Sequence, residues 1–335
     1  MQTRISAASY YLPENKISTT ELENRLIHEN PHIKFVPGLI SQITKIDSRQ
    51  YAHAHEYSST LAIKACNKLF DENSVKPDQI ELLIFASAGQ DLVEPATSHI
   101  VQNALGTACP VMDIKNACNS FLNALEVADS FIKQGKYKKI LICTGEKSSV
   151  GVKFKLKDKD DFRNSFAGYT FGDAGSAVLF EASEDNESRI IYSKFTAMSK
   201  YWSVGTLPGG GSRHPRGDEF TYFHGSGADL RDAFDELGPD LILDSLQSTG
   251  FEFSDFKRIF VHQVSLPMLQ VFLKSAGIDK DKILVTVVEY GNMAAATIPV
   301  GLAMSLEQGQ ISRGDKIMMI GLAGGVSLGV TILQY

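Results

Sequence analysis

Short runs of apolar, β-prone residues alternate with helical patterns along most of the chain. Buried strands are expected in seven runs, at residues 81–85, 111–114, 140–143, 177–180, 258–261, 283–286 and 317–320. After Cys118 the apolar residues recur on one stripe of a helix, and Gly135 is suited to the position just beyond its end. Strands that alternate with helices are typical of α/β proteins with buried sheets. We therefore predict an α/β fold.

The second half of the chain repeats the order of elements in the first half. In the first copy we expect a helix at 58–69 and strands at 80–85 and 111–114. A turn follows at Cys118, the next helix stops at Gly135, and a further strand is expected at 139–143. In the second copy we expect a helix at 230–246 and strands at 257–261 and 283–286. The turn is at Asn292, the helix stop at Gly309 and the further strand at 316–320. This order predicts two duplicated halves, residues 1–180 and 228–335, with a connecting region at 181–227.

Two stretches could be mistaken for functional segments. The run from Pro208 to Gly211 lacks the Gly-Lys-Ser/Thr ending of a phosphate loop, so we interpret it as a plain loop. The uncharged stretch from residue 317 to the C-terminus is interrupted by glycines, which favours two buried strands over a membrane span. The first residues lack the apolar core of a signal peptide, so we expect a cytoplasmic protein.

Composition narrows the function further. The 335 residues are 43% hydrophobic and 21% charged, which is ordinary for a globular protein with a large core. The net charge of −6 lacks the basic character of a nucleic-acid binder, so no nucleic-acid partner is expected. The four cysteines form no CxxC pattern, which indicates reduced thiols rather than a disulfide framework.

Three candidate catalytic residues lie where predicted strands end. Cys118 stands between the strand 111–114 and a helix, where the positive helix end is expected to lower the pKa of a nucleophilic thiol. His262 directly follows the strand 258–261, and Asn292 lies in a third strand-to-helix turn. Each has a plainer explanation, as a buried small residue, a structural histidine or a turn former. Their equivalent places in the repeated layout favour one shared site.

Five short motifs together resemble the thiolase superfamily, most closely 3-ketoacyl-ACP synthase III, over essentially the whole chain. They are Ala117-Cys118, His262-Gln263, Gly291-Asn292, Phe171-Gly172-Asp173-Ala174-Gly175 and Gly324-Gly325. The resemblance implies a thiolase-like, five-layered αβαβα fold of two similar halves and a homodimer. It also implies that Cys118 takes an acyl group from a thioester, while His262 and Asn292 hydrogen-bond the thioester oxygen of the second substrate.

The same resemblance implies the reaction and its participants. Two acyl thioesters, carried by an acyl carrier protein or by coenzyme A, would be joined by Claisen condensation. The backbone N–H groups of Cys118 and Gly325 would form the oxyanion hole, and donors of this kind suit an acyl-transfer intermediate. No metal or redox cofactor would be needed.

The sequence departs from the synthase III pattern at three places. Leu39 and Ile43 stand where that family has parts of its coenzyme A clamp, and Pro267 replaces a basic residue used for carrier docking. Glu94 stands where an apolar residue usually enters the partner subunit's acyl tunnel. In this segment, together with Asn116-Ala117-Cys118 and Gly145-Glu146, the chain is similar to the head-to-head condensing enzymes of olefin, pyrone and resorcinol synthesis, in which the glutamate at the place of Glu94 is a base. A surface glutamate that caps a loop is the plainer interpretation.

Two other functions stay open from the sequence. One is a catalytically silent subunit that pairs with an active partner, although such a subunit would be expected to lack the cysteine or the histidine. The other is a plain acyl transferase to an alcohol or amine, which would not need Asn292 to stabilise an enolate.

Overall fold

The computed structural model describes residues 1–184 and 187–335, and in this part of the chain five strands form the first sheet. In spatial order they are β1 (Gln2–Tyr11), β7 (Ala174–Ser183), β6 (Lys139–Glu146), β4 (Leu82–Ala86) and β5 (Val111–Ile114). β4 pairs in parallel with both β5 and β6, whereas β7 is antiparallel to β1 and β6. The carboxyl ends of β4, β5 and β6 therefore meet at one edge of the sheet.

Four strands of the described residues form the second sheet. Their order is β11 (Arg258–Val261), β12 (Lys316–Ala323), β13 (Ser327–Gln334) and β8 (Arg189–Ala197). β11 and β12 are parallel, and the other two pairs are antiparallel. β8 comes from the predicted connecting region 181–227, of which residues 185–186 lie outside the described part. The uncharged C-terminal stretch forms β12 and β13, as predicted.

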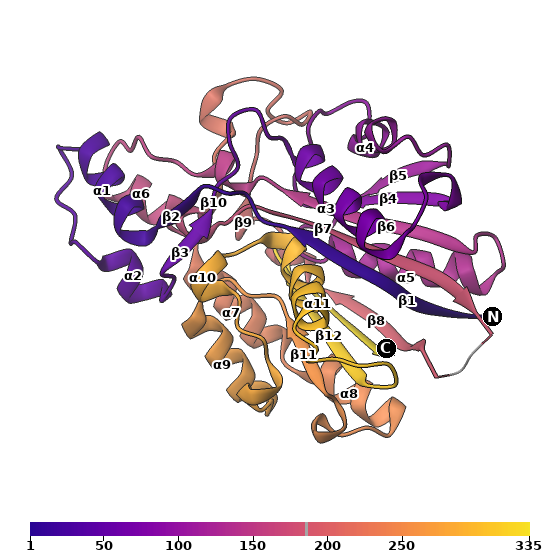
Figure 1. The fold of residues 1–335 in the computed structure, drawn as a ribbon. Coiled ribbons are helices and arrows are strands. Elements are labelled where there is room, and N and C mark those ends of the chain that lie inside the picture. The colour runs from indigo at the N-terminus through magenta and orange to yellow at the C-terminus, as the bar shows by residue number, and fades with distance from the viewer. Residues whose placement is uncertain (185–186) are drawn as a thin grey trace.

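Helices cover both sheets and fill the space between them (Figure 1). α3 (Ser58–Asn73) and α4 (Thr97–Leu105) pack on the outer face of the first sheet. α8 (Asp240–Thr249) and α9 (Leu266–Ala276) pack on the outer face of the second sheet. α5 (Ser120–Lys133) and α11 (Thr297–Glu307) lie between the sheets. This order of layers is the predicted five-layered αβαβα arrangement.

The alternation of side chains in the first sheet explains why it needs helices on both faces. Along β4, Leu82 and Ile84 point into the core between the sheets, whereas Leu83 and Phe85 point to α3 and α4. All four side chains are buried. A strand that is apolar on both faces is stable only when both are covered.

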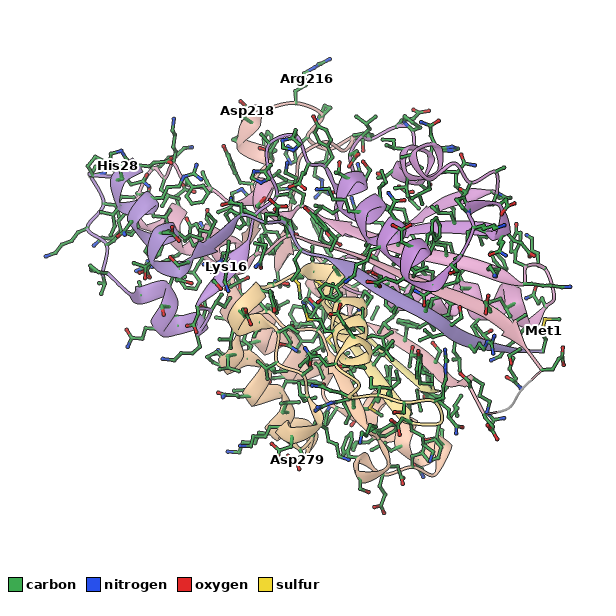
Figure 2. The ribbon with its side chains drawn as sticks, viewed as in Figure 1. Met1, Lys16, His28, Arg216, Asp218 and Asp279 are labelled. Atoms are coloured by element: carbon green, nitrogen blue, oxygen red, sulfur yellow. The ribbon has the colours of Figure 1, made fainter. Side chains whose placement is uncertain are left out.

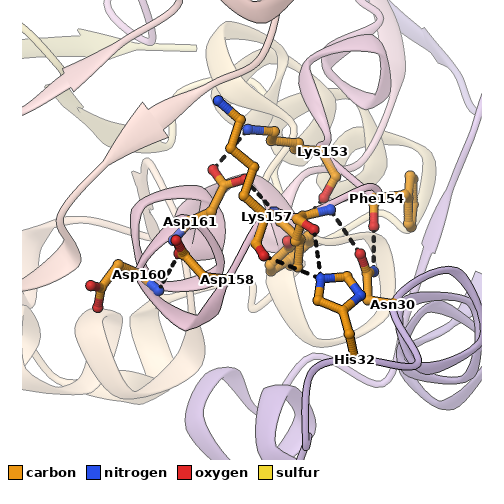
Figure 3. Close-up of polar contacts among 10 residues, drawn as sticks. Asn30, His32, Lys153, Phe154, Lys157, Asp158, Asp160 and Asp161 are labelled. Carbon is orange, nitrogen blue, oxygen red and sulfur yellow. Dashed lines mark hydrogen bonds and ion pairs between the residues drawn. The ribbon is translucent and has the colours of Figure 1, made fainter.

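A smaller group of elements forms one end of the molecule, at the left of Figure 1. It contains β2 (Lys16–Ser18), α1 (Thr19–Glu29), α2 (Leu39–Thr44), β3 (Ser48–Gln50) and α6 (Lys159–Ser165). Figure 3 shows how Asn30 and His32 join the chain after α1 to the segment before α6. Asn30 donates to the carbonyls of Leu26 and Phe154 and accepts from the Leu156 N–H at 2.7 Å.

The remaining elements belong to neither of the two large sheets. They are β9 (Gly205–Thr206), β10 (His224–Gly225), α7 (Gly227–Leu237) and α10 (Val287–Tyr290). Figure 2 shows Arg216 and Asp218 at the outer tip of the connection between β9 and β10. The run from Pro208 to Gly211, in this connection, is a loop as predicted.

Two predicted elements are wrong in the second half. The segment 283–286 is not a strand, because the Gln263 side chain takes its hydrogen bonds: it donates to the Leu284 carbonyl and accepts from the N–H groups of Thr286 and Val287. The predicted helix 230–246 is divided between α7 and α8. Gly238 has a φ of +68° and Pro239 lacks an N–H, so one continuous helix cannot pass through them.

Candidate active site

Cys118 lies in a tight turn between β5 and α5. Ala117 holds a left-handed φ of +46°, which is uncommon for a residue with a side chain. The Ser120 hydroxyl accepts from the Asn116 N–H at 2.8 Å and donates to the Ala117 carbonyl at 2.6 Å, so it closes the turn. Cys118 is half-buried, whereas the other three cysteines are buried. The turn therefore presents one thiol of the chain to an open space.

The predicted lowering of the thiol pKa is wrong. Burial, followed by the negative charge of Glu146, raises the pKa of the Cys118 thiol to about 12. A hydrogen bond with the backbone of Cys118 itself lowers the pKa but does not outweigh these two effects. Cys118 is therefore a neutral thiol before a substrate binds.

His262 directly follows β11, and its backbone N–H donates to the Ile320 carbonyl of β12 at 3.0 Å. The side chain is 5% exposed. Burial lowers the pKa of the imidazole to about 4, opposed in part by a hydrogen bond with the Ala294 backbone. Nδ1 has no hydrogen-bond partner within residues 1–184 and 187–335. The ring is therefore neutral near pH 7.

Asn292 lies in the turn that follows α10. Its backbone N–H donates to the Thr170 carbonyl at 2.8 Å, and its own carbonyl accepts from Gly172 at 3.0 Å. The side-chain oxygen accepts from the Ala294 N–H at 3.0 Å. The amide nitrogen donates to Thr170 Oγ1 at 3.5 Å, so its second N–H is the donor that remains for another group. Gly291 leaves room for this turn, since a Cβ there would lie 2.8 Å from the Thr170 carbonyl oxygen.

The turn between β12 and β13 brings Gly325 toward Cys118. Asn119, the neighbour of Cys118, donates from its side chain to Ser327 Oγ at 2.8 Å and to the Ser327 carbonyl. Gly321 allows the close approach, because a Cβ there would lie 1.8 Å from Asn119 Oδ1. Gly325 itself has a φ of +84°. The two predicted oxyanion-hole residues thus belong to turns that are bonded to each other.

Cys118, His262, Asn292 and Gly325 line one cavity of about 1760 Å³. They come from both sheets, so the structure brings together residues that are far apart in the sequence. Leu39 and Ile43, which replace the family's clamp, also line the cavity. Pro267 lies on its wall as well, at the start of α9.

Glu94 is not brought into this cavity. It is exposed, on the loop between β4 and α4, and its neighbours Leu92 and Val93 are 50% and 72% exposed. A role for Glu94 in its own subunit's site therefore has no support. Its predicted entry into a partner subunit stays a prediction.

Glu146 also lines the cavity, and the sequence pointed to it only as part of the Gly145-Glu146 motif, without a role in the site. It ends β6 and is only 1% exposed. Burial raises the pKa of its carboxyl to about 7, although hydrogen bonds from the backbone at Ala88, Gly89 and Ala295 oppose the shift. A polar residue that ends an apolar strand was the available signal, as it was for His262.

Six large apolar side chains are exposed at the wall of the cavity and form what we call the apolar rim. They are Val36, Ile43, Val150, Trp202, Leu207 and Val271, with exposed fractions of 48% to 62%. Isolated exposed apolar residues are normal, but a set around one opening marks a binding surface. An apolar ligand would cover them.

Residues 1–184 and 187–335 lack two other features. No helix in this part of the chain has the length and apolar character needed to cross a bilayer. Within the same residues, no cluster of three or more His, Cys, Asp or Glu side chains is arranged to hold a metal ion.

Comparison with known families gives two matches. The family described as 3-oxoacyl-[acyl-carrier-protein] synthase III matches residues 112–199. The family described as the C-terminal part of the same enzyme matches residues 246–335. The first match contains Cys118, and the second contains His262 and Asn292.

Comparison with individual proteins gives relatives of the full length. β-Ketoacyl-[acyl-carrier-protein] synthase III of Neisseria meningitidis serogroup A is 30% identical, and the match covers 99% of each chain. The enzyme of the same name from Neisseria gonorrhoeae is 29% identical with the same coverage.

Solved structures of OleA from Xanthomonas campestris have the same fold. A cysteine variant with bound lauric acid and lauroyl-CoA superposes with a TM-score of 0.90 at 22% identity, over 100% of this chain and 99% of the other. Variants of a histidine and of a glutamate in OleA give TM-scores of 0.91 and 0.89.

Proposed function

This chain belongs to the 3-oxoacyl-[acyl-carrier-protein] synthase III family of thiolase-fold enzymes, and from that premise we propose that Cys118, His262 and Asn292 are its catalytic residues. The protein is a condensing acyltransferase, which joins two acyl thioesters by Claisen condensation. The observation that supports the three residues is their meeting in one cavity from three separate turns, which follow β5, β11 and α10.

In the first step, Cys118 Sγ attacks the carbonyl carbon of an acyl thioester. The new S–C bond replaces the donor's own S–C bond, and the donor leaves as a thiol with the proton that Cys118 loses. The backbone N–H groups of Cys118 and Gly325 would stabilise the oxyanion of the tetrahedral intermediate. This role is supported by the hydrogen bonds that join their two turns through Asn119 and Ser327.

In the second step, the enolate of the second thioester attacks the acyl carbon on Cys118. The new C–C bond replaces the S–C bond, and Cys118 is released as a thiolate that recovers a proton. His262 and Asn292 would donate hydrogen bonds to the enolate oxygen. A neutral imidazole and an amide nitrogen suit this task, because both are N–H donors that keep their charge state near pH 7.

The substrates we propose are thioesters of an acyl carrier protein or of coenzyme A, with no resident cofactor. The apolar rim and the size of the cavity support an apolar acyl chain.

We also propose a homodimer, because Leu92 and Val93 expose apolar side chains beside Glu94. The division into halves 1–180 and 228–335 is retained as part of this proposal.

A second candidate function is condensation without decarboxylation. It is favoured by the carboxylate at position 94, on an exposed loop that a partner subunit could receive. A malonyl thioester makes its carbanion by losing carbon dioxide and needs no base, whereas a simple acyl thioester requires one. In this alternative, Glu94 takes the α-proton in the partner's site.

Mass spectrometry of the intact protein after incubation with a panel of acyl-ACP and acyl-CoA donors tests the proposal. We expect one acyl adduct on Cys118 and none on Cys118→Ala, because the other three thiols are buried. An adduct that persists in Cys118→Ala would contradict the assignment. Product analysis with and without a malonyl thioester then separates the two candidate functions, and strict dependence on malonyl would exclude the second.

A further inference from the structure

The segment 170–172 contacts Asn292 and contains the start of the Phe-Gly-Asp-Ala-Gly motif, to which the proposed reaction gives no part. The Asn292 N–H donates to the Thr170 carbonyl at 2.8 Å, and the Gly172 N–H donates to the Asn292 carbonyl at 3.0 Å. Phe171 and Asn292 thereby form an isolated parallel bridge. The backbone of Asn292 is therefore held by the backbone of this segment.

Arg49 of β3 keeps the segment in place. It is fully buried, and its guanidinium group donates to the Tyr169 carbonyl at 3.0 Å. Gly172 and Gly291 both pack on its side chain, because a Cβ at these positions would lie 3.2 and 3.1 Å from Arg49 Cβ. The segment and the Asn292 turn thus lie against the same buried side chain.

The side chain of Thr170 also reaches Asn292, and it can only accept a hydrogen bond from it. Thr170 is 4% exposed and lines the cavity. Its hydroxyl donates to the Ala167 carbonyl at 2.8 Å, and this bond uses the one proton of the hydroxyl, because a carbonyl cannot donate. The Thr170 oxygen then accepts from Asn292 Nδ2 at 3.5 Å.

Both ends of the Asn292 amide therefore have a protein partner. The oxygen accepts from the Ala294 N–H at 3.0 Å, and one N–H donates to Thr170 Oγ1. Because the amide group is planar, these two contacts also determine where the second N–H points. A separation of 3.5 Å is long for a hydrogen bond, so the contact with Thr170 orients the amide more than it stabilises the fold.

We propose that Thr170 is a positioning residue for the condensation step, which orients the Asn292 amide so that its second N–H meets the enolate oxygen. The inference rests on the proposed role of Asn292. Donors that are already oriented stabilise a developing charge better than donors that must first rotate. Since Asn292 serves only the second step, Thr170 should have no effect on the transfer of the acyl group to Cys118.

Thr170→Val tests the proposal, because valine has a similar shape but cannot accept a hydrogen bond. The acyl adduct on Cys118 should form at the wild-type rate, whereas the rate of condensation should fall about tenfold, as expected for one lost hydrogen bond. Thr170→Ser keeps the hydroxyl and should condense at the wild-type rate. An unchanged rate of condensation in Thr170→Val would overturn the proposal.

A double variant shows whether the effect passes through Asn292. In Asn292→Ala the amide is absent, so the addition of Thr170→Val should not lower the remaining rate of condensation any further. A second tenfold loss would mean that Thr170 supports the site independently of Asn292, which would also overturn the proposal. Adduct and condensed product are measured by mass spectrometry in the same reactions.

Thr331→Val is the matched control. Thr331 of β13 is also buried, and its hydroxyl pairs with Ser193 Oγ at 3.4 Å, but it does not line the cavity. Both steps should therefore proceed at the wild-type rate in this variant. A tenfold loss of condensation in Thr331→Val would show a general effect of removing a buried hydroxyl and would contradict the proposal.

A second pair of variants serves if Thr170→Val does not fold. Thr170→Ala and Thr170→Ser both lose the γ-methyl group and differ only in the hydroxyl, so the serine variant should condense about tenfold faster. Equal rates would overturn the proposal. The proposed function fails in a different way, through undiminished condensation in Asn292→Ala while Thr170 is intact.

Discussion

His262 and Asn292 lie on different turns but are expected to act on the same oxygen atom. We predict that His262→Ala and Asn292→Ala still form the acyl adduct on Cys118, because neither contributes to the oxyanion hole. Condensation should fall by about 10² to 10³ in each, as in the deletion of one oxyanion donor. Acyl adduct and condensed product are measured in the same reaction by mass spectrometry.

The exposed amide of Asn103 supplies a control for this pair of variants. Asn103→Ala lies in α4, away from the cavity, and should retain both steps. Undiminished carbon–carbon bond formation in the His262, Asn292 double variant would refute their assignment.

Accessibility, rather than acidity, should make Cys118 the cysteine that reacts. Cys66, Cys109 and Cys143 are buried, so we predict that iodoacetamide labels Cys118 first in the folded protein. The reaction should be slower than with a free cysteine, because the pKa of the Cys118 thiol is about 12. Peptide mapping over time measures both, and equal labelling of all four thiols would contradict the prediction.

The sequence identified where Cys118 stands but not how its thiol ionises. Its place before a helix could be predicted from the local pattern of residues 111–132. Ionisation is opposed first by burial in the folded molecule and then by the negative charge of Glu146, which ends β6. Both are tertiary effects, which no local pattern contains.

At the scale of elements, the order of layers could be predicted, whereas the sequence wrongly predicted a strand at 283–286. The apolar run at 283–286 has the composition of a strand, but the side chain of Gln263 satisfies its backbone instead of a neighbouring strand. The sequence around Gln263 did not indicate that its side chain would hydrogen-bond to the backbone of Leu284, Thr286 and Val287. Composition indicates that a segment is buried, whereas its hydrogen-bond partners decide its conformation.

The connection between α1 and the segment before α6 depends strongly on one residue. Asn30 is 1% exposed and uses both ends of its amide to bind Leu26, Phe154 and Leu156. Asn30→Ala would leave these buried backbone groups unpaired, so we predict a loss of about 2 to 3 kcal/mol in the free energy of unfolding. Urea denaturation measures it, and the exposed Asn103→Ala should change stability by less than about 0.5 kcal/mol.

At the scale of the whole molecule, subunit mixing tests Glu94. If Glu94 acts in the partner's site, neither Cys118→Ala nor Glu94→Gln homodimers should condense two non-malonyl thioesters. A mixed dimer should recover one site, with Cys118 from one subunit and Glu94 from the other, and random mixing should restore about a quarter of the wild-type activity. No recovery in dimers shown to have exchanged would place Glu94 outside the partner's site.

The pH dependence of stability should carry the signature of Glu146. Its pKa is raised from 4.5 to about 7 in the folded state, so the folded protein binds the proton more tightly than the unfolded chain. The stabilisation of the folded state by this proton is complete below about pH 4.5 and is lost as the pH rises through 7. Glu146→Gln should therefore gain about 3 kcal/mol relative to the wild type between pH 4 and pH 8. Parallel stability curves would contradict this prediction.

The core between the two sheets also determines when the site can exist during synthesis. This core joins Ile5 and Leu82 of the first sheet to Ile317 and Leu333 of the second, with α5 and α11 between them. At about 5 to 20 residues per second, the ribosome needs roughly 10 to 40 s to pass from Lys133 to Leu333. During this interval the second sheet, which packs against the inner side of the first half, is not yet complete. The nucleophile is thus made early, and the walls that shield it arrive last.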